Sequence, residues 1–147
     1  MLLMVSRLWS YPASRKLLFL EAIVVSTIAK LMVIGLPFRI IQKVFGFKVY
    51  QADVPSLTNS DSIPSVKTIF QTVDSISRHV FWTNTCLVRS ITVKYLLRRQ
   101  KVDALLYLGL AKDEQGQLKA HAWVKVLESG LVYDDGSGEY TTVAVLV

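Results

Sequence analysis

The chain contains a single cysteine, and the residues around it constrain the fold more than any other stretch. Cys86 follows Thr83, Asn84 and Thr85, residue types whose side-chain oxygens cap the first N–H groups of a helix. From Leu87 onward, apolar residues recur at helical spacing. The sequence therefore predicts an amphipathic helix with Cys86 in its first turn, where free N–H groups and the helix dipole stabilise a thiolate.

The residues after Cys86 divide into an apolar stripe and a polar side. The stripe consists of Leu87, Ile91 and Tyr95, widened by Val88, Leu96 and Leu97. The basic residues of this stretch are expected on the side that faces water: Arg89, Lys94 and Arg98.

A second stretch gives the cysteine a chemical context. A lone cysteine is more often a small buried hydrophobe than a nucleophile. Here His121 opens a predicted strand, and Asp134 and Asp135 follow it in the chain. The order Cys, His, Asp fits a thiol nucleophile, with the imidazole taking the thiol proton and a carboxylate fixing the tautomer of the ring.

Either aspartate can complete such a triad, because side chains alternate across a strand and the register of one hairpin decides which one faces His121. A two-residue turn pairs Leu127 with Gly130 and selects Asp134. A three-residue turn that includes Gly130 shifts the pairing by one residue and selects Asp135. Since glycine suits the left-handed position that ends a three-residue turn, we predict Asp135, with Asp134 as the alternative.

Residues 1–50 are basic and apolar. They contain seven Lys and Arg residues against the single acid Glu21, which gives +6. The whole chain also has a net charge of +6, so the net charge of residues 51–147 is zero. This neutral half and one short basic run at residues 98–101 argue against a nucleic-acid partner.

The apolar segment 17–38 is long enough for a membrane-spanning helix. Glu21 and Lys30 interrupt it, and a charge at the centre of such a helix costs about 2.5–3.5 kcal/mol on insertion scales. Gly35 and Pro37 then interrupt the helical pattern. We expect two helices within residues 12–45, packed against the rest of the chain or a partner, with attachment to an anionic membrane surface as the alternative.

The remaining chain predicts an α+β fold. Residues 51–65 are rich in turn formers and indicate a linker between a helical segment, 1–50, and a core, 66–147. The core begins with an amphipathic helix over 66–80, whose His79 is expected to be structural or exposed to solvent. Strands are expected after the cysteine helix, at 103–111, 120–127, 130–135 and 140–147.

The cysteine and histidine content of the chain indicates its cellular compartment and the cofactors that it can bind. One cysteine allows no intramolecular disulfide, and no small-residue cleavage site follows the apolar segment, so a cytoplasmic location is expected, with peripheral membrane contact as an alternative. Two histidines and one cysteine in separate elements are a poor zinc set, so no metal and no cofactor are expected.

Four motifs together resemble a known family. They are Phe81-Trp82 ahead of Cys86-Leu-Val-Arg, then Leu96-Leu-Arg-Arg, Leu108-Gly-Leu and Ala120-His-Ala-Trp-Val. They are similar to the B-type leader peptidase of lasso peptide biosynthesis, a cysteine protease with a transglutaminase-like (papain-type) fold. The resemblance covers roughly residues 66–147 by motif, and Phe81 departs from it where the family more often has proline.

The resemblance implies roles and partners. It makes Cys86 the nucleophile, His121 the general base and one aspartate of the 134–135 pair the orienting acid, and it places Trp82 and Trp123 at the oxyanion or substrate pocket. It implies a precursor peptide as substrate, bound through its leader by a separate recognition protein, and a lasso cyclase that acts on the cleaved product.

Two other classes of function stay open. The first is an acyl-transfer enzyme, either a transglutaminase or an amidase. A triad of this kind does not by itself determine whether water or an amine accepts the acyl group. The second is a non-enzymatic, membrane-associated scaffold in which the basic, apolar N-terminal segment is the functional part.

Overall fold

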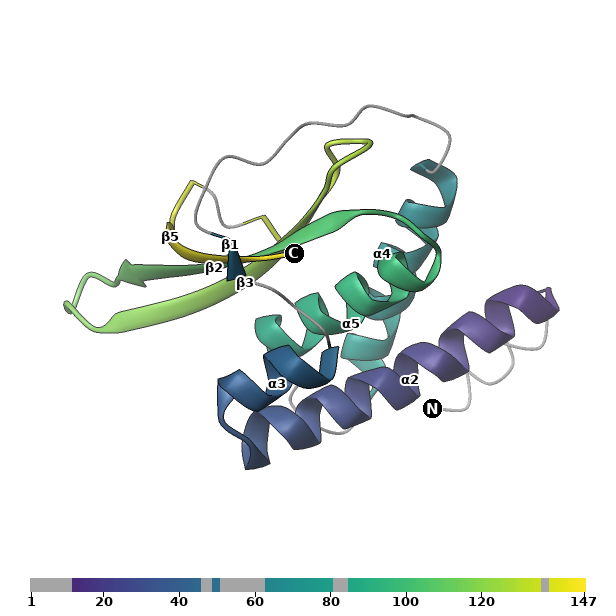
Figure 1. Ribbon diagram of the computed structural model, residues 1–147, viewed down its shortest axis with the longest axis horizontal. Helices are drawn as coiled ribbons and strands as arrows, with labels where there is room; N and C mark the ends of the chain where they lie inside the picture. The colour runs from purple at the N-terminus through teal and green to yellow at the C-terminus, as the bar shows by residue number, and fades with distance from the viewer. Residues whose placement is uncertain (1–11, 46–48, 51–62, 81–84, 136–137) are drawn as a thin grey trace.

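The computed structural model describes residues 12–45, 49–50, 63–80, 85–135 and 138–147. The described elements form three layers (Figure 1): an antiparallel sheet, then α4 (Ile63–His79) and α5 (Cys86–Arg99), then α2 (Ala13–Gly35). Helix α5 packs against the sheet on one side and against α2 on the other. The predicted α+β class is confirmed.

The two helices expected within residues 12–45 are confirmed as α2 and α3 (Phe38–Phe45). Pro37 disfavours a helical conformation in the residue before it, and Leu36 accordingly is extended, with φ −127° and ψ 144°. The inner face of α2 carries the small residues Ala22, Ser26 and Ala29, all buried, which let α2 approach α4 and α5 closely.

Helix α5 begins where the sequence predicts. Thr85 has an extended conformation, and its hydroxyl accepts a hydrogen bond from the N–H of Val88 at 3.5 Å, as an N-cap residue does. Cys86 is therefore the first residue of the helix. Helix α4 starts at Ile63, three residues before the predicted start, and His79 at its end is exposed, as expected.

The expectation that Lys94 faces water is wrong. Its side chain is 5 % exposed, and Nζ donates a hydrogen bond to the carbonyl of Ala104 at 2.6 Å. Burial lowers the pKa of Lys94 to about 8, with a further lowering by Arg98 and an opposing effect of Asp103. The reason for the error is tertiary: α5 is the middle layer, so it has no wide face left for water.

The sheet has the strand order β1-β5-β2-β3-β4, and every neighbouring pair is antiparallel. Its strands are β1 (Val49–Tyr50), β2 (Ala104–Lys112), β3 (Leu118–Val126), β4 (Val132–Tyr133) and β5 (Thr141–Leu146). The predicted strand over 130–135 is thus much shorter than expected. This difference matters because β4 forms an edge of the sheet.

The predicted register of the β3–β4 hairpin is also wrong. Val124 pairs with Tyr133 and Lys125 with Val132, which is the register of the alternative that pairs Leu127 with Gly130 and selects Asp134. Gly130 does have the expected left-handed conformation, with φ +66°.

The turn around Gly130 is longer than the predicted one. The N–H of Leu127 donates to the carbonyl of Asp103 at 2.9 Å, so it is not used to pair with β4. The N–H of Val126 instead donates to the carbonyl of Leu131 at 2.8 Å. Leu127 therefore belongs to the turn, and the strand pairing starts one residue earlier than the predicted register requires.

The N-terminal helices share the core of the rest of the chain. Ala22 and Ala29 of α2 and Ile41 of α3 belong to the same buried cluster as Val88 of α5 and Leu106 of β2. The predicted linker lies mostly outside the described residues, so the division into a segment at 1–50 and a core at 66–147 stays a prediction.

Candidate active site

Cys86 is the candidate nucleophile, and its backbone position suits that role. It is a half-buried free cysteine at the first position of α5, where backbone N–H groups lack acceptors within the helix. The start of a helix is a position at which nucleophilic cysteines are found in proteins. Within the part of the chain that the structure describes, the thiol makes no hydrogen bond.

Ser90 fastens the beginning of α5 to β3. It lies one helical turn after Cys86, and its buried hydroxyl donates a hydrogen bond to the carbonyl of Ala122 at 2.9 Å. Ala122 is adjacent to His121. Because β4 pairs only up to Tyr133, α5 reaches this carbonyl at an edge of β3 that no described strand covers. The helix that bears Cys86 and the strand that bears His121 are thus joined by a hydrogen bond, which lies one turn after the cysteine and next to the histidine.

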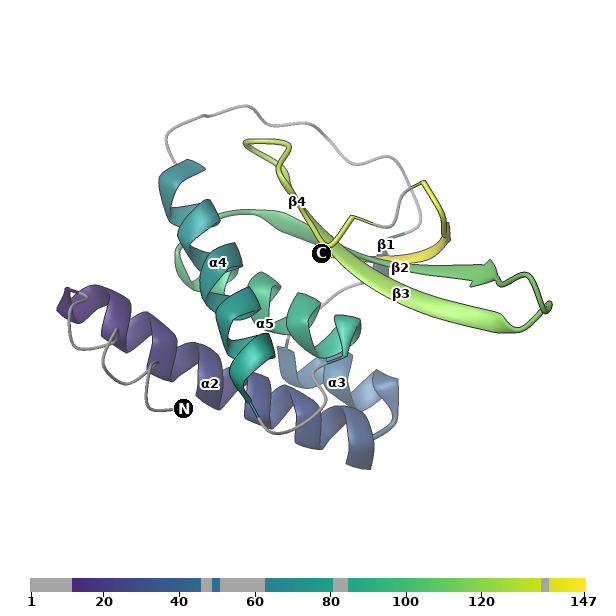
Figure 2. The same ribbon diagram turned by 180° about the vertical axis from the view of Figure 1, so that it is seen from behind.

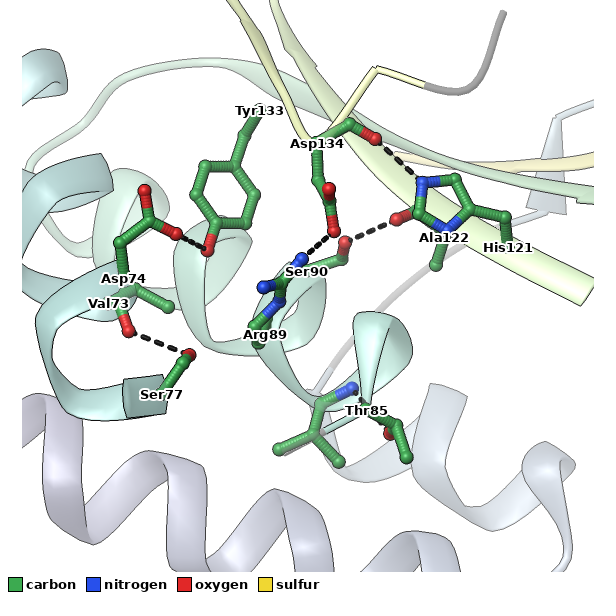
Figure 3. A network of polar contacts seen from close by, with 11 residues as sticks. Val73, Asp74, Ser77, Thr85, Arg89, Ser90, His121, Ala122, Tyr133 and Asp134 are labelled. Atoms are coloured by element: carbon green, nitrogen blue, oxygen red, sulfur yellow. Dashed lines mark hydrogen bonds and ion pairs between the residues drawn. The ribbon is translucent and has the colours of Figure 1, made fainter. Parts of the chain in front are cut away.

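Arg89 makes a second connection at the same edge. Its guanidinium forms an ion pair with the carboxylate of Asp134, the residue that follows β4 (Figure 3). Asp134 has the left-handed φ of +56°, a conformation that aspartate tolerates better than most residues. The guanidinium also lies 5.8 Å above the ring of Tyr133, whose hydroxyl donates to Asp74 of α4 at 2.7 Å. Burial raises the pKa of Tyr133, so it stays a neutral donor.

The imidazole of His121 is held by the same residue, Asp134. Its Nε2 lies 2.8 Å from the carbonyl oxygen of Asp134 (Figure 3). A carbonyl oxygen can only accept, so this contact requires the proton on Nε2 and leaves Nδ1 with a free lone pair. The ring also contacts Tyr140, with ring centroids 5.0 Å apart. Nδ1 is therefore the nitrogen that can take up a proton.

Helix α5 and the side chain of His121 lie on opposite faces of the sheet, and Asp134 contacts both at the edge of the sheet. Val124 and Val126 of β3 belong to the core beneath the sheet, so alternation turns His121 and Trp123 to the opposite face. Trp123 is 3 % exposed and stacks on Tyr107 at 5.5 Å. Asp134 lies past the end of β4, where it reaches Arg89 with its side chain and His121 with its backbone.

Residues 32–147, from the last turn of α2 onward, match the family model of the transglutaminase-like superfamily. The chain belongs to the transglutaminase-like superfamily. This superfamily includes cysteine proteases and acyltransferases, and its members are generally enzymes. No curated protein and no solved structure matches the chain. The match confirms the transglutaminase-like fold that the motifs suggested.

The predicted site residues of this transglutaminase-like chain differ in how they are placed. His121 and Asp134 are in contact, while the side chain of Asp135 is exposed. Trp82 lies outside the described residues, and Trp123 is buried next to the imidazole. The pairing of Cys86 with His121, and the choice between the two aspartates, stay predictions.

Arg89 is the residue that the sequence reasoning missed. The sequence predicts Arg89 on the solvent-exposed face of the helix, whereas its guanidinium is half-buried against Tyr133 and Asp134. The signal was its place in the motif Cys86-Leu-Val-Arg89, which puts the arginine one turn after the cysteine. Among the described residues, no group of three or more His, Cys, Asp or Glu side chains could hold a metal ion.

Proposed function

We propose that this transglutaminase-like protein is a cysteine endopeptidase that removes the leader from a ribosomally made lasso peptide precursor. The observation that carries the proposal is the double role of Asp134, which joins the cysteine helix through Arg89 and holds Nε2 of His121. In that arrangement Nδ1 of His121 is the nitrogen left to act as a base, and the helix that Asp134 joins is the one that bears Cys86. The motif resemblance supplies the substrate class.

In the proposed reaction, Nδ1 of His121 takes the proton from Cys86, and the thiolate attacks the carbonyl carbon of the scissile peptide bond. In this proposal the backbone N–H of Cys86 donates a hydrogen bond to the oxyanion. The imidazolium then gives its proton to the departing amine, which leaves a thioester on Cys86. Water, deprotonated by the same imidazole, then attacks the thioester and breaks its C–S bond, which releases the acid, and the imidazolium returns the proton to the Cys86 thiolate.

The thiol and the imidazole need not be in hydrogen-bond contact before substrate binds. Catalytic hydrogen bonds are often long in the free enzyme and tighten in the complex. Ser90 and Arg89 limit how far α5 can move relative to β3, because each fixes the first turns of the helix to the sheet. The proposal therefore requires Cys86 and His121 to meet at the edge of β3, where Asp134 contacts both Arg89 of α5 and His121.

The proposed partners follow from the substrate. The peptidase would act with a separate leader-recognition protein and upstream of a cyclase that joins the freed amine to a side-chain carboxylate. The described core is small, and its helices and sheet pack on one another. A second protein that presents the leader at the edge of β3 would supply the substrate affinity.

The test starts with the reactivity of the thiol. Iodoacetamide should alkylate Cys86 faster than a free thiol near neutral pH, and His121→Ala should abolish the acceleration. His79→Ala is the matched control, since the second histidine is exposed on α4, where its Nδ1 contacts the carbonyl of Ser75. Equal alkylation rates in wild type and His121→Ala would contradict the proposed pairing.

The second measurement identifies the reaction. The chain is incubated with a lasso precursor peptide and its leader-recognition protein, and the masses of the products are measured by mass spectrometry. Hydrolysis adds water to the severed bond, whereas acyl transfer to an added amine gives the amide. Cys86→Ala and Cys86→Ser should both abolish cleavage. If the amide is the main product, the chain is an acyltransferase of the same superfamily.

A further inference from the structure

Helix α2 is apolar on two opposite faces. Its inner face, with Ala22, Val25 and Ala29, is buried against α4 and α5. Its outer face carries six large aliphatic residues, each 46–71 % exposed: Leu17, Leu20, Val24, Ile28, Leu31 and Ile34. At 100° per residue these six fall on one continuous stripe opposite the buried one. A helix at the surface of a soluble domain normally presents polar residues there.

The position of α2 makes this stripe an outer surface of the molecule. Helix α2 is the layer farthest from the sheet, as the two opposite views show (Figures 1 and 2). The stripe therefore faces away from the candidate active site. An exposed aliphatic stripe of this length marks an interaction surface.

The net charge of the two helices that include the stripe indicates what covers it. The described residues 12–45 contain five cations and one acid, which gives +4, and the acid, Glu21, is paired with Arg99 of α5. The cations are Arg15, Lys16, Lys30, Arg39 and Lys43. A second copy of the chain would bring the same positive charge to this surface. An anionic bilayer instead offers an apolar interior and negative headgroups together.

The composition of the stripe also favours lipid over a protein partner. Protein interfaces are enriched in aromatic residues, Met and Arg, whereas all six residues of the stripe are Leu, Val or Ile. We propose that the outer face of α2 binds an anionic lipid bilayer, with the helix lying in the plane of the membrane surface. This inference does not depend on the proposed peptidase activity.

The inner face explains why the helix lies on the membrane and does not cross it. By length and composition α2 could span a bilayer. However, a spanning α2 would have to leave α4 and α5, because its inner face is part of the core that includes Ala22 and Ala29. It would also break the ion pair between Glu21 and Arg99 and place the acid in lipid. Lying flat keeps these contacts and buries only the outer stripe.

The experiment is sedimentation of the purified full chain with lipid vesicles. Vesicles of phosphatidylcholine alone are compared with an equal mixture of phosphatidylcholine and phosphatidylglycerol. We expect binding to the mixed vesicles, weaker binding to the neutral ones, and release at high salt. Changing Lys30 and Lys43 together to Gln should weaken binding to the mixed vesicles roughly 30-fold, since each surface cation contributes a few-fold to tenfold.

A second variant tests the stripe itself. Leu20→Gln with Leu31→Gln removes two exposed leucines without touching the core, and binding should fall more than about tenfold. The matched control is Leu118→Gln with Val143→Gln, which removes two residues of similar exposure, 68 % and 57 %, from the sheet. The control variant should bind like the wild type.

Each other outcome overturns the proposal. No binding to either vesicle means that another part of this chain or a protein covers the stripe. A lipid-free dimer that Leu20→Gln with Leu31→Gln dissociates, seen by light scattering, identifies a second copy as the occupant. Protein that stays in native membranes after high salt and alkaline carbonate is inserted across them and does not lie on their surface.

Discussion

The carbonyl oxygen of Asp134 lies 2.8 Å from Nε2 of His121. In this contact the backbone of Asp134, and not its carboxylate, holds the ring. The carboxylate is used elsewhere, in the ion pair with Arg89 of α5. Anything that rotates Asp134 therefore changes both the orientation of the imidazole and its connection to the helix that bears Cys86.

The first prediction compares the two aspartates. Asp134→Asn removes the charge that Arg89 pairs with, while asparagine still tolerates the left-handed conformation. We expect it to lower kcat/KM for leader cleavage at least about tenfold, a loss of about 1.4 kcal/mol. Asp135→Asn, at an exposed position, should have a smaller effect. The register that favoured Asp135 is wrong, and a larger loss in Asp135→Asn would show that the acid acts from there nevertheless.

The second prediction concerns Arg89 as a positioning residue. Arg89→Gln leaves the carboxylate of Asp134 without its partner, so the orientation of His121 is less restricted. We expect slower alkylation of Cys86 by iodoacetamide and a loss of stability of about 1.5–3 kcal/mol, typical of a hydrogen bond to a charged group. Arg89→Lys should restore part of the alkylation rate. A variant that loses stability but keeps the wild-type pH profile of alkylation would show a purely structural role.

The third prediction tests the packing around the imidazole. A Cβ on Gly109 would come within 2.7 Å of both the indole of Trp123 and Cβ of Tyr140, two residues whose rings contact His121. Gly109→Ala should lower the free energy of unfolding by about 1–3 kcal/mol and reduce cleavage. Gly35→Ala, with no atom near its added Cβ, is the control and should be neutral or stabilising. Wild-type stability of Gly109→Ala in urea would contradict this packing.

The fourth prediction is a pH dependence from Lys94. Its pKa is about 8 in the folded chain and 10.5 ordinarily, with burial as the main cause. Below pH 8 both states are protonated, and the folded state bears the full cost of the buried charge, on the order of 3 kcal/mol. Between the two pKa values the unfolded chain binds more protons, so this contribution to stability rises with pH.

The measurement is urea unfolding of wild type and Lys94→Met at about pH 7 and about pH 10. Other titrating groups cancel in the difference between the two proteins. We expect the stability of the wild type relative to Lys94→Met to increase at the higher pH. A difference that stays constant, or that falls, would show that the ammonium is well compensated where it lies.

The sequence alone determined the local elements and the candidate chemistry. The threonine before Cys86 and the apolar spacing after it fix the start of α5, because capping and helical periodicity act within a few residues. Proline and glycine likewise separate α2 from α3. The motifs around Cys86 and His121 were sufficient to suggest the transglutaminase-like superfamily, which the family match confirms.

Tertiary structure decided what depends on distant parts of the chain. The observed β3–β4 register goes with a turn in which the N–H of Leu127 donates to the carbonyl of Asp103 on the β2 side, and neither turn propensity nor alternation contains that contact. From the sequence, Lys94 and Arg89 are expected to face solvent. Lys94 is buried because α5 lies between two layers, and Arg89 is half-buried because α5 lies beside the end of β4. Local spacing shows which residues share a face of a helix or strand, but only packing determines whether that face meets water, a core or an opposite charge.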